Sequence, residues 1–245
     1  MMIRDVLRLA WFEWKNMSVK GIGSVIFILV CYSILFAYAA QEGNDVAFFG
    51  MDIVFIIGVL LWFGGSQFNG EPFNLKKMND GVLSSPFYRY MKRMPVSEVV
   101  LFRSRLLVKS IYLAVVMFVL VSLVVIVELS PFPFLFGNDA FVSFAAFWIA
   151  VAMISAMNAI NEIGYNKKED TRMDLKAIAW ISGFLIFYLV FWVWLVPYNG
   201  TFIRFTIEYA AAQPTAMLAI AGAIVFVTLW TVDVAGRHKI KRQGV

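Results

Sequence analysis

The sequence predicts an all-α membrane protein with six transmembrane helices, an N-terminal interfacial helix and a short cytoplasmic helix between the second and third spans. Of its 245 residues, 61% are hydrophobic and 15% are charged, whereas a soluble domain of this size is about 45–50% apolar. The apolar residues form long runs without the alternation of a transmembrane barrel. Because backbone groups cannot stay unpaired in lipid, each run is expected to be a helix.

Six of these runs are long enough to cross the roughly 30 Å hydrocarbon core of a bilayer. They are spread over the whole chain, so residues 1–245 are expected to form one transmembrane domain without a separate soluble domain. The predicted spans are residues 22–40, 46–65, 106–127, 140–160, 177–196 and 215–234.

The distribution of positive charge predicts the orientation of these spans. All but two of the 21 Lys and Arg lie in four segments: the N-terminal segment, residues 66–105, the segment between the fourth and fifth spans, and the C-terminal tail. The exceptions are Lys109 and Arg204. Cytoplasmic loops carry an excess of Lys and Arg, so both termini are expected in the cytoplasm. The net charge of +5 then reflects membrane topology, and no nucleic-acid partner is expected.

Residues 1–21 precede the first span and are amphipathic. Their apolar residues recur at helical spacing, and Arg and Lys lie largely off this face. The pattern is typical of a helix in the membrane interface, with Trp at headgroup depth and the basic side chains towards anionic lipid. The apolar face consists of Ile3, Val6, Leu7, Ala10, Trp11, Trp14 and Met17.

A search for catalytic and metal-binding motifs finds none. The chain lacks the GxxxxGK[ST] loop that binds nucleotide phosphates, and it lacks GxSxG, HExxH and paired-cysteine motifs. Its only histidine, His238, lies in the basic tail, and its only cysteine, Cys31, lies in an apolar run. We therefore expect no metal site, no directly bound cofactor and no enzymatic activity of the chain by itself.

Three residues within the spans are candidates for a substrate path. Asp52 lies about two turns inside the second span, where a charge is costly; it is either functional or a carboxylate that water reaches beneath the headgroups. Asn158 lies near the inner end of the fourth span, among small residues that indicate packing within the chain, a dimer seam or a substrate path. Trp192 belongs to the aromatic fifth span, which contacts either lipid or amphipathic cargo.

The longest predicted cytoplasmic segment, residues 66–105, ends in a basic and aromatic stretch. Ser85 and Pro86 form a helix-start signal, Pro95 ends this short helix and Ser97 can cap the next one. Aromatic residues, Met and Arg are enriched in protein interfaces, which favours a docking element over a lipid-bound helix. The candidate docking residues are Pro86, Phe87, Tyr88, Arg89, Tyr90, Met91, Lys92 and Arg93.

Residues 197–214 differ from the other predicted outer loops. They are too apolar for a solvated loop and too short to span the membrane. They form either short helices that dip back into the outer leaflet or an amphipathic loop.

This layout resembles the permease subunits of ABC type-2 exporters. The similarity is strongest over residues 80–107, where a turn formed by Met94, Pro95, Val96 and Ser97 leads through Arg103 and Arg105 into the third span. The family usually has Leu where this chain has Met94. Some of these permeases export peptides, including bacteriocins and phenol-soluble modulins, from Gram-positive bacteria.

The resemblance implies roles for three segments. Residues 86–93 would be the coupling helix that fits a groove in a separate cytoplasmic ATPase subunit. Residues 1–21 would be an elbow helix that also touches the ATPase, with Trp11, Glu13 and Trp14 as candidate contacts. Residues 197–214 would be a re-entrant gate on the outer side.

The function that the resemblance implies is export of a hydrophobic or amphipathic substrate, such as a peptide, across a bacterial plasma membrane. ATP and Mg²⁺ would be bound by the partner ATPase, and a second copy of the chain or a homologous permease would complete the pathway. Two alternatives remain open: a membrane sensor or immunity protein without transport, and a small intramembrane enzyme. The enzyme would need clustered carboxylates or a nucleophile–base pair, and the sequence shows neither.

Overall fold

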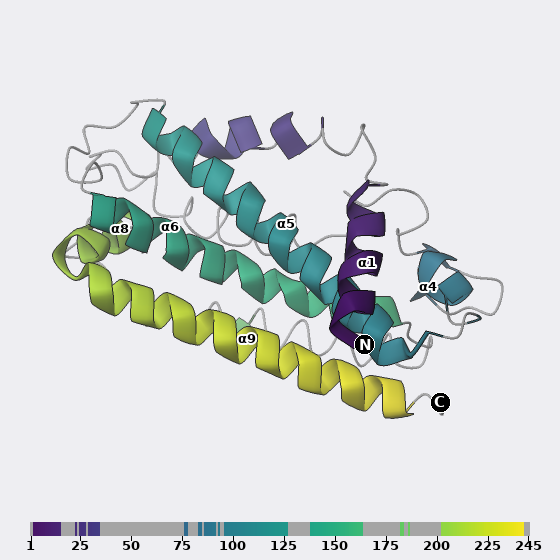
Figure 1. The fold of residues 1–245 in the computed structure, drawn as a ribbon. Coiled ribbons are helices and arrows are strands. Elements are labelled where there is room, and N and C mark those ends of the chain that lie inside the picture. The colour runs from purple at the N-terminus through teal and green to yellow at the C-terminus, as the bar shows by residue number, and fades with distance from the viewer. Residues whose placement is uncertain are drawn as a thin grey trace.

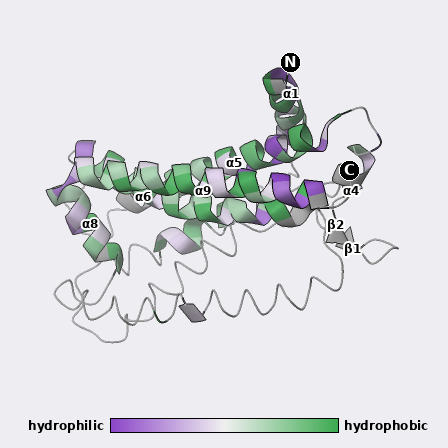
Figure 2. Ribbon diagram, turned by 90° about the horizontal axis from the view of Figure 1, so that it is seen from below, coloured by the Kyte–Doolittle hydropathy of each residue, from purple (hydrophilic) through white to green (hydrophobic). Residues whose placement is uncertain are grey.

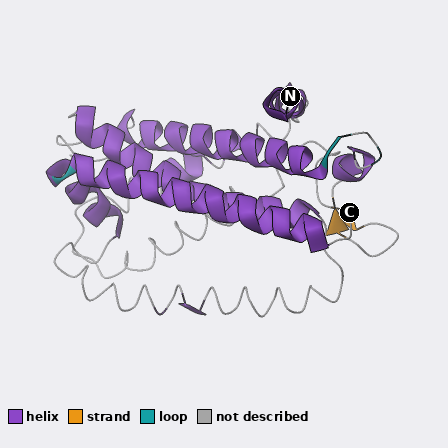
Figure 3. Cartoon of the chain, turned by 60° about the horizontal axis from the view of Figure 1, so that its bottom comes forward, coloured by secondary structure: helices purple, strands orange, loops and turns teal. Residues whose placement is uncertain are grey.

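The computed structural model describes the chain in parts, and these parts are almost entirely helical (Figure 3). The predicted second span, including Asp52, lies outside the described residues, as do most of the fifth span and Trp192. The described positions of the first and fifth predicted spans are helical. The described residues are 2–15, 23, 25–27, 29–34, 76–77, 83–84, 86–91, 93, 96–126, 138–163, 182–183, 186 and 202–242.

Seven helical elements have defined bounds. They are α1 (Met2–Lys15), α4 (Pro86–Met91), α5 (Glu98–Ile126), α6 (Asn138–Met153), the 3₁₀ helix η6 (Ile154–Ile163), α8 (Phe202–Ala212) and α9 (Pro214–Arg242).

A two-residue antiparallel ladder precedes α4. The all-α fold expected from the sequence does not include this ladder. Strand β1 (Lys76–Lys77) pairs with β2 (Leu83–Ser84), and Lys76 lies opposite Ser84. The ladder is small, and the fold of the described residues is built on helices.

Among the described residues, three helices are long and apolar enough to cross a membrane: Glu98–Leu123, Asp139–Ile160 and Pro214–Lys241. They coincide with the predicted third, fourth and sixth spans. In Figure 1 the three lie side by side; α6 and α9 run in the same direction and α5 runs the opposite way. Both termini lie at one end of this bundle (Figures 1 and 2). We call it the basic end because it carries Arg103 and Arg105 of α5 and Arg237 and Lys239 of α9.

Two of these helices extend beyond the predicted spans at the basic end. Helix α5 begins at Glu98, directly after the predicted cap Ser97 and before the apolar span predicted from residue 106, and α9 continues to Arg242, beyond the span end predicted near residue 234. The added turns contain Arg and Lys side chains that pair with groups of neighbouring helices, as described below. Positive charge therefore marks the end of each apolar span without ending the helix.

The inner part of the fourth span differs from the α-helix expected over residues 140–160. After Met153 the chain tightens into η6, in which side chains three residues apart eclipse one another. Burial follows this period of three, since Met153, Ala156 and Ala159 are buried while Met157 is 38% exposed. The small side chains of Ala156 and Ala159 reduce the crowding that eclipsing would otherwise cause.

The core lies between α5, α6 and α9. Its largest inaccessible side chains include Trp148, Phe144, Phe102 and Met117. In the candidate span formed by α6 and η6, 61% of the most apolar 18-residue stretch is buried inside the protein. The corresponding share for α9 is 22%. The fourth span is therefore central, and α9 is the most exposed of the three candidate spans.

The small residues of the fourth span pack within the chain. Ala150, Ala152, Ala156 and Ala159 are fully buried, and α6 and η6 pack most extensively against α9. Of the three interpretations that the sequence left open for this face, the structure favours packing within the chain for these four residues.

Candidate functional site

Helix α1 is attached to the basic end of the bundle by a buried ion pair. The guanidinium of Arg105 on α5 pairs with the carboxylate of Glu13, and these side chains are only 1% and 3% exposed. Removing one partner from such a pair leaves an uncompensated buried charge. Glu13 therefore fixes α1 to α5.

The rest of α1 has a second face that the bundle leaves exposed. Ala10 and Glu13 are buried towards α5, whereas Ile3, Leu7 and Trp11 are 76%, 55% and 70% exposed. The single apolar face expected from the sequence is therefore divided, and only part of it packs on the protein. Trp14 lies between the two faces and is partly buried.

Helix α4 begins at Pro86, as the helix-start signal predicts, and ends at Met91, before the expected end at residue 93. Phe87 stacks on Phe12 of α1, with ring centroids 6.1 Å apart and an interplanar angle of 20°. Tyr90 is 61% exposed, and Arg93 is also exposed in the turn that follows. This contact joins the two elements that the resemblance assigns to ATPase binding.

The remaining candidate docking residues are only partly defined. Pro86 and Met91 are partly buried, and Met91 packs against the core. The side chains of Tyr88 and Arg89, and the whole of Lys92, lie outside the described residues.

The start of α5 follows α4 after a short connection, residues 92–97. The Ser97 hydroxyl accepts a hydrogen bond from the amide of Val100 at 3.3 Å, which is the arrangement of a serine N-cap. This confirms the prediction that Ser97 starts the next helix.

Helices α5 and α9 are connected at the same end by a second set of charges. The Arg103 guanidinium donates two hydrogen bonds to the Asp233 carboxylate, at 2.9 and 3.0 Å. Arg237, one turn further along α9, also pairs with Asp233 at 3.0 Å. Bidentate pairing of this kind fixes orientation as well as distance.

Close packing accompanies these charges. Gly236 of α9 lies against the ring of Phe102, and a Cβ atom at this position would overlap the ring. On the next turn, Lys239 donates a hydrogen bond of 3.2 Å to the Ile160 carbonyl near the end of η6. The last turns of α9 therefore hold both neighbouring spans.

The opposite end of the bundle is formed by α8 and the helices that it contacts. Phe202, at the start of α8, packs on Phe147 and Trp148 with centroid distances of 6.1 Å for each pair. Near the end of α8, the Ala210 carbonyl lies 3.5 Å from the Ser143 hydroxyl. Helix α8 therefore runs back along α6 in the opposite direction.

The candidate substrate-path residues are not brought together in the described part of the chain. Asn158 lies on η6, partly buried and engaged by neighbouring groups, while Asp52 and Trp192 lie outside the described residues. Among the described residues, no three His, Cys, Asp or Glu side chains gather in a group that could hold a metal ion.

Sequence reasoning missed the two central ion pairs. Arg103 and Asp233 are separated by 130 positions, and no local pattern in the sequence links them. The available signal was an acidic residue at the basic end of one span and an arginine at the same depth in another. Opposite charges at equal membrane depth are expected to pair because isolated charges are costly there.

Comparisons with protein-family models, with curated proteins and with solved structures find no significant match for this chain.

Proposed function

We propose that this chain is the membrane-embedded permease subunit of an ATP-driven exporter, with ATP hydrolysed by a separate cytoplasmic subunit. The observation that carries the proposal is the grouping of α1 and α4 at the basic end. Phe12 stacks on Phe87, and Glu13 joins the pair of helices to α5. A partner that contacts this surface would therefore act on a candidate membrane span.

The contacts supply a route by which movement could be transmitted. A push on α4 acts on α1 through the stacked rings and on α5 through the connecting residues 92–97. Helix α5 acts on α9 through Arg103 and Asp233. Switching between two membrane states requires such rigid elements whose contacts differ between the states.

The orientation required by this proposal agrees with the charge distribution. The positive-inside rule assigns the basic end to the cytoplasm, where an ATPase is available. The sequence contains no P-loop, so ATP and Mg²⁺ are assigned to the partner. The three candidate spans support membrane insertion, and the full proposal has six spans in a bacterial plasma membrane.

Helix α8 supports a re-entrant element on the outer side. Its first residue, Phe202, packs on Trp148, which lies about 15 Å along α6 from the start of that helix. One leaflet of the hydrocarbon core is about 15 Å deep, so in the proposed topology α8 would reach well into the outer leaflet. A gate at this position would close a path between two permease subunits.

Co-expression with P-loop ATPases encoded beside its gene tests the proposal. We expect one of them to co-purify with the chain in detergent and to hydrolyse ATP faster in vesicles that contain the chain. Tyr90→Ala with Arg93→Ala should weaken this association because both side chains are exposed beside the α1–α4 contact. Phe118→Ala is the matched control, since Phe118 is a 51% exposed aromatic residue on α5 away from this surface.

Two outcomes would contradict the proposal. If the chain neither retains nor stimulates any of these ATPases, an ATP-driven permease is excluded and a sensor or immunity protein becomes the better interpretation. If the ATPase binds equally to the Tyr90/Arg93 variant and to wild type, the docking surface is not α4.

A further inference from the structure

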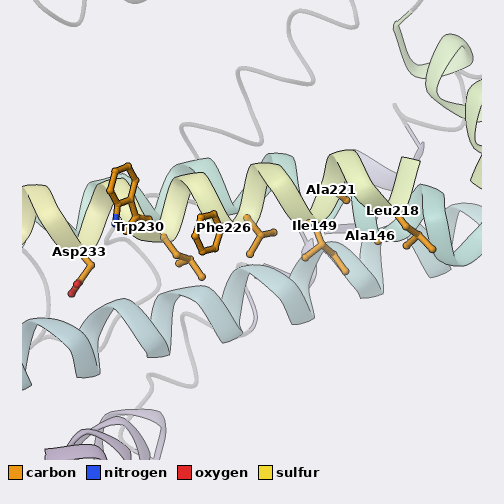
Figure 4. A pocket seen from close by; sticks show the side chains of 10 residues that line it. Ala146, Ile149, Leu218, Ala221, Phe226, Trp230 and Asp233 are labelled. Carbon is orange, nitrogen blue, oxygen red and sulfur yellow. The ribbon is translucent and has the colours of Figure 1, made fainter. Parts of the chain in front are cut away.

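A groove runs along α9 beside α6 (Figure 4). It encloses about 790 Å³ and is open along its side. Its lining is apolar except at one end, where Asp233 lies. The lining includes Ala146 and Ile149 of α6 and Leu218, Gly222, Phe226 and Trp230 of α9.

The floor of the groove is shaped by small residues. Gly222 has open space where its side chain would be, and Ala146 and Ala221 also line the groove. Further along α9, Phe226 and Trp230 are 70% and 61% exposed. The groove is therefore a hollow floored by small residues beside two large aromatic side chains.

The length of the groove suits an extended hydrocarbon chain. Leu218 and Asp233 are about 22 Å apart along α9, at about 1.5 Å per residue. This exceeds the depth of one leaflet, about 15 Å, so a lipid chain seated here can lie fully extended.

The charged end of the groove has an excess of positive charge. Asp233 is bound by both Arg103 and Arg237, whose side chains are 32% and 45% exposed. Two guanidinium groups share one carboxylate, which leaves one positive charge without a local counter-charge among these three groups. Trp230, about one turn away, is of the residue type that concentrates at headgroup depth.

We propose that this groove binds one anionic phospholipid, with an acyl chain along α9 and the phosphate beside Arg103 and Arg237. The excess positive charge favours an anionic over a zwitterionic headgroup. A protein helix over the same face would enclose that charge away from water, which is costly, whereas a lipid headgroup leaves it at the membrane surface. This site rests on membrane insertion of α6 and α9 and does not depend on the proposed transport function.

Native mass spectrometry tests the acyl-chain part of the site. The purified chain is reconstituted in vesicles containing equal amounts of phosphatidylglycerol and phosphatidylcholine, extracted into mild detergent and analysed for retained lipid. We expect one phosphatidylglycerol per chain in the wild type and its loss in Gly222→Leu, which fills the hollow. Val227→Leu is the matched control, because Val227 is 53% exposed on the same helix and does not line the groove.

Circular dichroism and size-exclusion chromatography establish that each variant is folded. If folded Gly222→Leu retains as much lipid as Val227→Leu, the groove does not bind the chain and the proposal fails.

A second pair of variants tests the headgroup. Arg237→Gln should lower the preference for phosphatidylglycerol over phosphatidylcholine by about fivefold, the factor expected for one cationic side chain near an anionic surface. Lys241→Gln removes the same charge from an exposed position of the α9 tail and should leave the preference unchanged. Equal retention of both lipids by the wild type, or equal effects of the two variants, would overturn the assignment of an anionic lipid. These assays contain no ATPase, so their outcome is independent of the test of transport.

Discussion

The two ends of the bundle are held together by different kinds of contact. At the basic end, α1 and α9 are fixed to α5 by Glu13–Arg105 and Arg103–Asp233. At the opposite end, α8 is fixed to α6 by aromatic packing of Phe202 on Trp148. Charge pairs depend on the chemical identity of both partners, whereas aromatic packing depends on volume. Isosteric polar changes should therefore matter mainly at the basic end, and changes of size mainly at the opposite end.

Trp148→Ala should have the largest effect. Trp148 is fully buried between α6 and α8, and truncating a buried Trp costs about 3–5 kcal/mol. Unfolding in mixed detergent–SDS micelles measures the change in free energy, with Phe118→Ala as an exposed aromatic control. A loss no greater than that of the control would show that packing does not hold the opposite end.

Glu13→Gln should have an effect of about 3 kcal/mol, because it leaves the Arg105 charge buried without a carboxylate. The double variant Glu13→Leu with Arg105→Met should recover most of the lost stability, since a well-packed apolar pair can replace a buried ion pair. The same unfolding assay measures both. A double variant that is no more stable than Glu13→Gln would contradict the interpretation that unpaired charge causes the loss.

Gly236→Ala should destabilise the basic end by about 1–3 kcal/mol, as expected for overpacking, because the added methyl group meets the Phe102 ring. Gly222→Ala on the same helix is the matched control. Its methyl group enters open space, and replacing a helical Gly by Ala is favourable by about 0.5–1 kcal/mol. The two substitutions should therefore shift the unfolding midpoint in opposite directions; shifts of the same sign would mean that the α5–α9 contact is looser than described.

Thr206→Val should have the smallest effect. The buried Thr206 hydroxyl donates to the Ile203 carbonyl within α8 at 2.7 Å, and Val keeps the shape of the side chain. Removing this local hydrogen bond should change stability by about 1 kcal/mol or less. An effect comparable with that of Glu13→Gln would show that polar contacts govern both ends.

Local physics explains which parts of the fold were predictable. Apolar run length predicts the three candidate spans, and the signals at Pro86 and Ser97 predict where α4 and α5 begin. Each of these signals is contained within a few turns of sequence. The apolar composition of residues 197–214 indicates that this segment is not a solvated loop, although the sequence leaves its conformation open.

The contacts that define the candidate site could not be predicted in the same way. Glu13 lies on a face otherwise classified by its apolar neighbours, and nothing near it in sequence specifies Arg105. The stacking of Phe12 on Phe87 likewise depends on how α1 and α4 are placed in space. Residues 154–163 are largely apolar, so their pattern does not separate the period of 3.6 of an α-helix from the period of three of a 3₁₀ helix.

The 3₁₀ geometry of η6 gives the fourth span a longer reach than its residue count suggests. A 3₁₀ helix advances about 2.0 Å per residue, against about 1.5 Å in an α-helix. Over its 10 residues, η6 is therefore about 5 Å longer than the same segment would be as an α-helix. This extension carries the Ile160 carbonyl to the level of Lys239, in the basic turns of α9. Rewinding η6 into an α-helix would shorten the span by about one helical turn and withdraw this carbonyl from the lysine.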